Sequence, residues 1–183
     1  MKLSDDLLKR LYAASEYMED NFPARKFTIA GGCLRDDLLG RPVKDIDIFI
    51  HGFSTDPVPE GCEDAGERNA YLMFAKTVYV GSEEINLIFL RGEWCALDVA
   101  ARCDIGICQV AWTKGTGLVY TDAFVKDVVF KTLTVTRNTS LDHVERVERK
   151  FYDFESVRGD YQVTNGNIKG WHYNSATGKV ELK

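Results

Sequence analysis

Apolar residues recur at every third or fourth position over residues 4–20, and this spacing predicts an amphipathic helix. Ser4 is the expected N-cap, because Asp5 and Asp6 follow it in the first turn, where the helix dipole stabilises acids. Pro23 is expected to end the segment, since proline cannot continue a helix. The apolar stripe would face a core and consists of Leu7, Leu8, Leu11, Ala14, Tyr17 and Met18.

The chain then changes from helical to alternating periodicity. Residues 26–30 predict a strand, two glycines follow directly, and residues 33–39 predict a short helix. Residues 44–50 (KDIDIFI) alternate strictly between polar and apolar positions. Successive side chains of a strand point to opposite faces, so Asp45 and Asp47 are expected on one face and three isoleucines on the other.

The remaining pattern predicts short helices and strands in alternation after a Pro/Gly-rich loop over residues 51–64. The order of these elements is typical of a mixed α/β (α+β) domain whose sheet is not fully parallel. Helices are expected over residues 65–75, 94–102, 122–129 and 140–152, and strands over 77–80, 85–90, 105–112, 115–120 and 132–136, with short strand-like pieces near Trp171 and Val180.

Length and composition place few limits on this picture. A chain of 183 residues favours one domain, or one domain with a small appendage. Its 45% hydrophobic and 28% charged residues are ordinary for a globular protein. The formal net charge of −5 argues against a dedicated nucleic-acid binder, although a local basic patch remains compatible with it.

The cysteines and the N-terminus bear on the compartment. The five cysteines are odd in number and match no zinc-binding spacing, so free thiols in a reducing cytoplasm are expected. The first ten residues carry no apolar run, and no stretch approaches the ~18 apolar residues of a membrane span. We therefore expect a cytoplasmic protein with no membrane partner.

Candidate chemistry is concentrated in residues 30–50. Gly31 and Gly32 lie between a strand and a helix, where backbone N–H groups and the helix dipole can approach a phosphate. The segment is not a P-loop, because no G-x-x-x-x-G-K-[ST] motif is present. Arg35 could clamp a phosphate oxygen with its planar guanidinium, or could instead be a surface arginine paired with a neighbouring acid.

Asp45 and Asp47 are two positions apart on one strand, so their carboxylates would lie about 6–7 Å apart along the chain. Two like charges so placed repel unless a cation neutralises them. Divalent cations such as Mg²⁺ prefer oxygen ligands and substrate phosphates. The alternative is a polar, solvent-exposed sheet face.

Together these motifs resemble the signature of the DNA polymerase beta-like nucleotidyltransferase superfamily. The order is Gly-Gly, then residues 34–36 (LRD), then residues 38–40 (LLG), then residues 44–47 (KDID). The segment is most similar to the head region of CCA-adding enzymes and bacterial poly(A) polymerases. The resemblance implies a nucleotidyltransferase fold, with a mixed sheet flanked by helices, over residues 1–153. Residues 154–183 would form a small C-terminal extension with short strands.

The resemblance also implies roles for individual residues. Asp45 and Asp47 would bind two Mg²⁺ (or Mn²⁺) ions and act in catalysis. The triphosphate would be held by Gly31, Gly32, Arg35 and Asp36.

The superfamily has a third acidic residue on a later strand, and Asp104 is the favoured candidate. Residues 101–111 (ARCDIGICQVA) resemble the arginine-aspartate segment that follows the Asp-x-Asp pair in CCA-adding enzymes, with Arg102 as a further nucleotide contact. Asp98 is the rival, although it could equally be an acid on a helix surface. Glu93 is a further option.

Residues 131–150 resemble a segment of small stand-alone nucleotidyltransferases, many of them phage-encoded. His143, Arg146 and Lys150 would share one face of the helix expected there. Arg146 and Lys150 are candidate nucleotide contacts. The alternative is a solvated helix with an ion pair between Glu145 and Arg149.

The function implied by the resemblance is transfer of a nucleoside monophosphate from an NTP to a hydroxyl acceptor, with release of pyrophosphate. The acceptor could be an RNA or tRNA 3′ end, a protein or a small molecule, and DNA is not expected. CCA-adding enzymes carry long helical regions beyond the head, whereas only about 30 residues follow the last matching helix here, so tRNA 3′-end synthesis is not expected simply to carry over. The alternative is a non-catalytic nucleotide sensor or antitoxin-like partner, and the oligomeric state stays open.

Overall fold

The computed structural model describes residues 1–53, 63–64, 72–136, 162–165, 171–174 and 179–182. Two compact units are present. The first comprises Met1–Val99 and Ala111–Val119, and the second comprises Ala100–Val110 and Tyr120–Lys183. The expected domain boundary at residue 153 lies outside the described residues and stays a prediction. Within the described part of the chain, no helix is long and apolar enough to cross a membrane.

Helix α1 (Asp5–Asn21) opens the first unit and confirms the predicted amphipathic helix. The hydroxyl of Ser4 accepts a hydrogen bond from the backbone N–H of Leu7 at 3.1 Å, which is the expected N-cap. The backbone N–H of Ser4 donates to Asp37 at 2.8 Å. The start of α1 is thereby joined to α2 (Gly32–Leu38). The buried face of α1 consists of Leu7, Leu11, Ala14, Ser15 and Met18.

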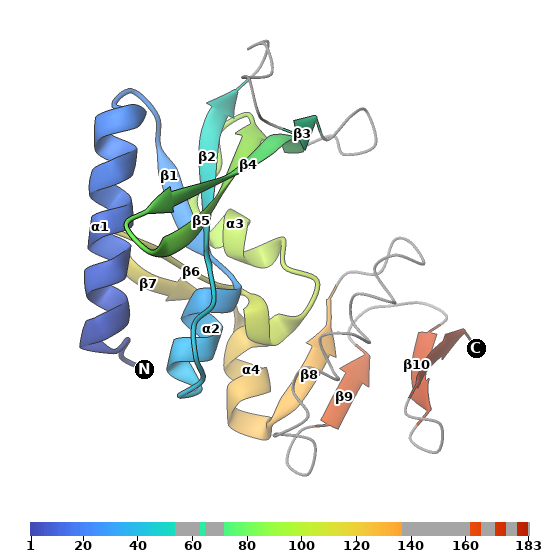
Figure 1. Cartoon of the computed structure of the whole chain (residues 1–183). Helices are drawn as coiled ribbons and strands as arrows, with labels where there is room; N and C mark the ends of the chain where they lie inside the picture. Colours follow the sequence, from blue (N-terminus) through green and yellow to red (C-terminus); the bar gives the residue numbers. More distant parts are fainter. Residues whose placement is uncertain (54–62, 65–71, 137–161, 166–170, 175–178, 183) are drawn as a thin grey trace. The chain divides into compact units, whose positions relative to one another are not determined.

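A seven-stranded mixed sheet in the order β3-β4-β5-β2-β1-β6-β7 forms the centre of the first unit (Figure 1). β2 pairs with β5 in parallel, whereas β1–β2, β1–β6, β3–β4 and β4–β5 are antiparallel. The mixed α/β fold with helices beside a mixed sheet is therefore confirmed. The strands are β1 (Phe27–Ala30), β2 (Ile46–Phe53), β3 (Glu63–Asp64), β4 (Leu72–Val80), β5 (Glu83–Arg91), β6 (Val110–Thr113) and β7 (Gly117–Tyr120).

The two parallel strands at the centre of the sheet alternate in burial. Phe22, just after α1, packs edge-on against Phe89 with ring centroids 5.8 Å apart. Asp47 and Asn86 are half-buried, at positions that alternate with the buried ones. The buried positions of the two strands are Ile46, Ile48, Ile50, His51, Phe53, Ile85, Leu87, Phe89 and Leu90.

Three parts of the predicted secondary structure are wrong. Residues 51–53 continue β2 and residues 63–64 form β3 where a loop was expected, and residues 72–75 belong to β4 where a helix was expected. β4 pairs with β5 from Leu72 to Val80, so the ladder overrides any local helical preference. Gly106–Cys108 form a 3₁₀ turn where a continuous strand was expected.

The second unit is described by itself. Its helix α4 (Asp122–Phe130) begins at Thr121, whose hydroxyl accepts from the backbone N–H of Phe124 at 3.3 Å. β8 (Thr132–Val135) follows and pairs in parallel with β9 (Gln162–Asn165). The unit also contains an antiparallel pair, β10 (Trp171–Asn174) with β11 (Lys179–Leu182). Helix α3 (Ala96–Ala101) leads into it.

Asp127 organises the described core of the second unit. Its buried carboxylate accepts hydrogen bonds from the Thr132 hydroxyl at 2.7 Å and from the backbone N–H and hydroxyl of Thr134 at 2.9 and 2.6 Å. A Cβ on Gly106 would lie 2.6 Å from this carboxylate and 3.1 Å from the carbonyl oxygen of Ala123. The 3₁₀ turn can approach α4 this closely because residue 106 has no side chain.

Candidate active site

Asp45 and Asp47 are brought together with Asn86, a residue of the neighbouring strand. Asp47 lies in β2 and is directly opposite Asn86 of β5 in the parallel register. Asp45 immediately precedes β2, and both carboxylates are half-buried. The Asn86 amide nitrogen donates to an oxygen of Asp47 at 3.0 Å and to an oxygen of Asp45 at 3.1 Å. One amide therefore joins the two acids that the sequence predicts as the site.

A third strand orients that amide. Thr77 of β4 is opposite Asn86 in the antiparallel register, and its hydroxyl donates to the Asn86 amide oxygen at 2.9 Å. The N–H side of the amide consequently faces the carboxylates. Sequence reasoning missed Asn86, although it is a single polar residue within the apolar run INLIFL of a predicted strand. That position is the signal that could have identified it.

The two glycines lie next to the acids. Gly31 has φ +88° and ψ −127°, a conformation open to glycine and rarely to other residues. A Cβ built on Gly31 would be 4.0 Å from an Asp47 carboxylate oxygen. The turn between β1 and α2 therefore runs directly beside Asp47. A ligand held by the acids would meet backbone there with no side chain in between.

Arg35 forms the ion pair that the sequence left open, but it is buried and not on the surface. Its guanidinium donates to both oxygens of Asp36 at 2.9 and 2.7 Å, and only 6% of the residue is exposed. Arg41 lies 3.8 Å from the same carboxylate. A Cβ on Gly32 would be 3.7 Å from the Arg35 guanidinium. Asp36 thus fixes Arg35 beside the glycine turn.

Cys33 is buried in the first turn of α2. Burial raises the pKa of its thiol to about 12, and the negative charge of Asp47 adds to this shift. The thiol is therefore protonated at neutral pH. It contributes a small neutral group beside the acids.

Two of the three candidates for the additional acid have structural roles in the first unit. Asp98 caps α3: it accepts from the backbone N–H of Cys95 at 3.1 Å, and its pKa is lowered by hydrogen bonds from the Cys95 side chain and backbone. It is exposed, as the reading of a helix-surface acid expects. Glu93 is also exposed and lies 3.3 Å from the amine of Lys26.

Asp104 and Arg102 belong to the second unit, where both are half-buried. The Asp104 carbonyl oxygen accepts from the backbone N–H of Thr136 at 2.8 Å. The nearby Gln109 amide donates to the carbonyl of Cys103 at 2.9 Å, which fixes this turn further. The functional roles of Asp104 and Arg102 stay predictions. His143, Arg146 and Lys150 lie outside the described residues.

Oxygen ligands are what this site offers a metal ion. The described residues contain no group of three or more His, Cys, Asp or Glu side chains that could hold a metal. The donor set is instead the carboxylates of Asp45 and Asp47, while the Asn86 amide turns its N–H side to them and its oxygen to Thr77. Hard divalent cations take carboxylate oxygens, so the two acids fit Mg²⁺ or Mn²⁺.

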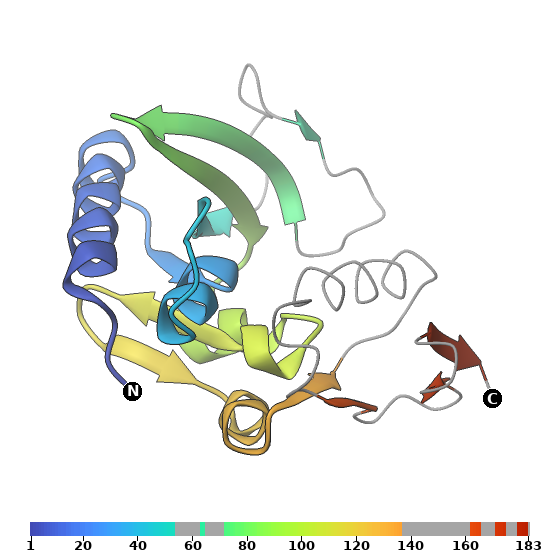
Figure 2. The same ribbon diagram turned by 60° about the horizontal axis from the view of Figure 1, so that its bottom comes forward.

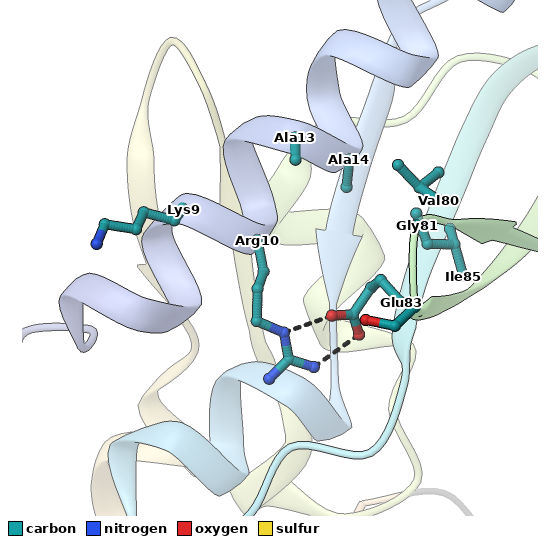
Figure 3. Close-up of a pocket in the computed structure, with 9 residues that line it drawn as sticks. Lys9, Arg10, Ala13, Ala14, Val80, Gly81, Glu83 and Ile85 are labelled. Carbon is teal, nitrogen blue, oxygen red and sulfur yellow. Dashed lines mark hydrogen bonds and ion pairs between the residues drawn. The ribbon is translucent and has the colours of Figure 1, made fainter.

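A pocket of about 350 Å³ lies elsewhere in the first unit, between α1 and the turn of the β4–β5 hairpin (Figure 3). Arg10 of α1 donates two hydrogen bonds of 2.6 Å to the carboxylate of Glu83. Its guanidinium also donates to the carbonyl oxygen of Val43 at 3.4 Å. Because Glu83 balances the charge of Arg10, this contact is structural. It fastens α1 to the start of β5 and to the segment before Asp45.

Comparison with known proteins finds similarity in structure only. No protein-family model and no curated protein sequence matches this chain. A solved tRNA-processing enzyme in an apo form superposes with a TM-score of 0.57 at 18% identity, over 90% of this chain and 45% of its own. The Thermotoga maritima CCA-adding enzyme complexed with tRNA gives 0.57 at 18% identity, over 89% and 40%. A CCA-adding enzyme with ATP gives 0.55 at 17% identity, over 90% and 43%.

These values establish a shared fold. The chain has the fold found in CCA-adding enzymes, which are nucleotidyltransferases, and it spans less than half the length of the first structures it matches. Fold alone leaves function to be argued from the site.

Proposed function

We propose that this protein is a metal-dependent nucleotidyltransferase that moves a nucleoside monophosphate from an NTP to a hydroxyl acceptor and releases pyrophosphate. The observation that carries the proposal is the pair of half-buried carboxylates, Asp45 and Asp47, beside the side-chain-free turn at Gly31. The fold shared with CCA-adding enzymes supports it.

The site residues have distinct roles in this proposal. Asp45 and Asp47 would hold Mg²⁺ or Mn²⁺, which would also bind the triphosphate. When bound, such ions activate the attacking oxygen and stabilise the leaving one. Gly31 and Gly32 let the backbone approach the phosphates closely, and Asp36 holds the guanidinium of Arg35 beside this turn, where Arg35 is a proposed phosphate contact. Asp104 is the proposed third acid and Arg102 a proposed nucleotide contact.

RNA is the acceptor that the comparisons favour. Among the similar structures are a CCA-adding enzyme complexed with tRNA and others with ATP or CTP. The net charge of −5 gives no general attraction for a polyanion, so the acceptor must be recognised locally. We propose an RNA 3′ end, with a protein or a small hydroxylated molecule as the alternatives.

Pyrophosphate release tests the activity. It is measured with each of the four NTPs and Mg²⁺, with and without total tRNA, on the wild type, Asp45→Asn and Asp47→Asn. Asp20→Asn, at an exposed position of α1, is the matched control for loss of one carboxylate. We expect release that rises with tRNA and survives in Asp20→Asn. Both site variants should lose at least about 100-fold in rate, the size of a lost electrostatic contact to the transition state.

The alternative of a nucleotide sensor has one observation in its favour, because the described residues contain no cluster of three acids. NTP binding that needs Asp45 and Asp47, without release on any acceptor, would support the sensor. Release that is equal in the wild type and both site variants would refute the site.

A further inference from the structure

Asn86 is a polar residue of the candidate site, and neither the sequence motifs nor the fold assigns it a role. Its amide lies 3.0 Å from an Asp47 oxygen and 3.1 Å from an Asp45 oxygen. We infer that Asn86 is a positioning residue of the cation site: it holds the two acids together and limits the charge of the site, so that a cation binds tightly only together with a nucleoside triphosphate. This inference rests on the proposed function.

The strand register places Asn86 between Asp47 and Thr77. Asp47, Asn86 and Thr77 form one row across β2, β5 and β4, with each residue directly opposite the next. Thr77 donates to the amide oxygen, so the amide presents its N–H side to the acids. Asparagine and aspartate have the same shape. A carboxylate at position 86 would therefore stand within hydrogen-bond distance of both acids, where a third metal ligand could act.

The choice of an amide at this position has an electrostatic consequence. Three carboxylates in contact would repel one another strongly without a cation. An amide instead donates to charged acceptors, and such hydrogen bonds are stronger than neutral ones. The acids are therefore held together before any ligand arrives. The cost is affinity, since affinity for a hard cation rises with the number of charged oxygen ligands. Phosphate oxygens of an incoming NTP can supply what the protein lacks.

Mn²⁺ affinity measured by titration calorimetry tests this inference without relying on turnover. The protein forms are the wild type, Asn86→Asp and Asn86→Ala, each with and without a non-hydrolysable NTP analogue. We expect Asn86→Asp to bind Mn²⁺ alone about tenfold more tightly, and Asn86→Ala to bind it more weakly than the wild type. The analogue should tighten Mn²⁺ binding more in the wild type than in Asn86→Asp.

Melting in EDTA separates positioning from general support of the sheet. Asn86→Asp should melt below the wild type in EDTA and gain more from Mn²⁺, whereas damage to the sheet would weaken Mn²⁺ binding in both variants. Asn21→Asp is the charge-matched control, because the amide of Asn21 donates to the carbonyl of Tyr17 at the end of α1. It should leave Mn²⁺ affinity unchanged.

The outcomes distinguish this inference from the proposed function. Mn²⁺ binding that needs Asp45 and Asp47 but is equal in all three Asn86 forms, or weaker in both variants, overturns the role of Asn86 alone. Absence of any binding that depends on those acids, with or without the analogue, overturns the metal site of the proposed function and this inference with it.

Discussion

Cys33 illustrates how strongly one residue of the site depends on its neighbours. Its thiol is buried in the turn beside Asp47, and its pKa of about 12 follows from burial and from that negative charge. A thiolate is the reactive form of cysteine, so the Cys33 thiol is unreactive although it lies within the candidate site.

Alkylation should therefore discriminate between the cysteines. At about pH 8 roughly one Cys33 in ten thousand would be ionised. We expect iodoacetamide to modify the exposed Cys95 in the folded protein and to leave Cys33 unmodified, as measured by peptide mass mapping. In denaturant both should react. Equal rates in the folded protein would contradict the burial of Cys33.

His51, near the end of β2, should make the stability of the protein depend on pH. Burial lowers its pKa from the ordinary 6.5, and Lys26 lowers it further, against opposing effects of Glu93 and the Trp94 backbone. The unfolded chain therefore binds a proton more readily than the folded one. Stability from neutral His51 is present above the unfolded pKa and is lost as pH falls through the folded pKa.

Urea unfolding of the wild type and His51→Gln tests this dependence. Between about pH 7.5 and 5.5, where unperturbed histidine titrates, the wild type should lose more stability than the variant. Identical pH profiles for the two proteins would show that His51 does not carry the effect.

At the residue scale the sequence indicates the acids but not their partner. Asp45 and Asp47 are visible because alternation places residues i and i+2 on one face. Asn86 is 39 residues from Asp47, and only the parallel register of β2 with β5 brings them together. Strand pairing over such a distance has no local signal in a single sequence.

An ion pair links helix α1 to the β4–β5 hairpin. In Figure 2 the turn of the hairpin lies beside α1. Arg10 of α1 donates to Glu83 at the start of β5, as Figure 3 shows. The two side chains are 24% and 19% exposed, so the ion pair is only partly screened by water. The hydrogen bonding of Arg10 to the Glu83 carboxylate raises the pKa of Arg10.

Loss of this contact should destabilise the first unit. We expect Arg10→Ala to lower the free energy of unfolding by about 1–3 kcal/mol, the size of charged hydrogen bonds that are partly buried. Arg10→Lys keeps the charge but loses the bidentate geometry. Its free energy of unfolding should therefore lie between those of the wild type and Arg10→Ala. Urea unfolding measures both. An unchanged midpoint in Arg10→Ala would show that the pair is not fastening the elements.

Asp127 joins α4 to β8 within the second unit. Replacing it with Asn leaves one carbonyl oxygen for three donors and adds an N–H with no acceptor assigned to it. We expect Asp127→Asn to cost about 2–4 kcal/mol in chemical unfolding, because buried donors would lose a charged acceptor. Thr132→Val removes a single donor and should cost less. A cost for Asp127→Asn below that of Thr132→Val would contradict the arrangement.

The elements were predictable where local pattern and tertiary structure agree. The helices α1 and α4 follow from caps and periodicity. The β4–β5 turn follows from Gly81-Ser82. The prediction of a helix over residues 65–75 is wrong for residues 72–75, because a short apolar run can form either a helix or a buried strand. The 3₁₀ turn at Gly106–Cys108 depends on close contact with Asp127, which no local pattern reveals.

For the whole molecule, ligand binding and stability are linked. A cation with an NTP analogue that binds only the folded chain at 100 times its Kd would add about 2.7 kcal/mol of stability. For a chain of this length that corresponds to roughly 5–10 °C in melting temperature.

We expect this upward shift in the wild type with Mg²⁺ and a non-hydrolysable NTP analogue, measured by differential scanning fluorimetry. EDTA should abolish it, and Asp47→Asn should lack it. A full shift in EDTA would show that the nucleotide binds without a cation.

The row from Thr77 through Asn86 to Asp47 also bears on the order in which the protein folds. Local turns of α1 form without distant partners, whereas the parallel pairing of β2 with β5 must close a long loop first. The acids therefore acquire their shared amide only after that closure. A nascent chain that has emerged only as far as β2 carries the whole Asp-x-Asp motif, yet its ligand site waits for a strand still to be synthesised.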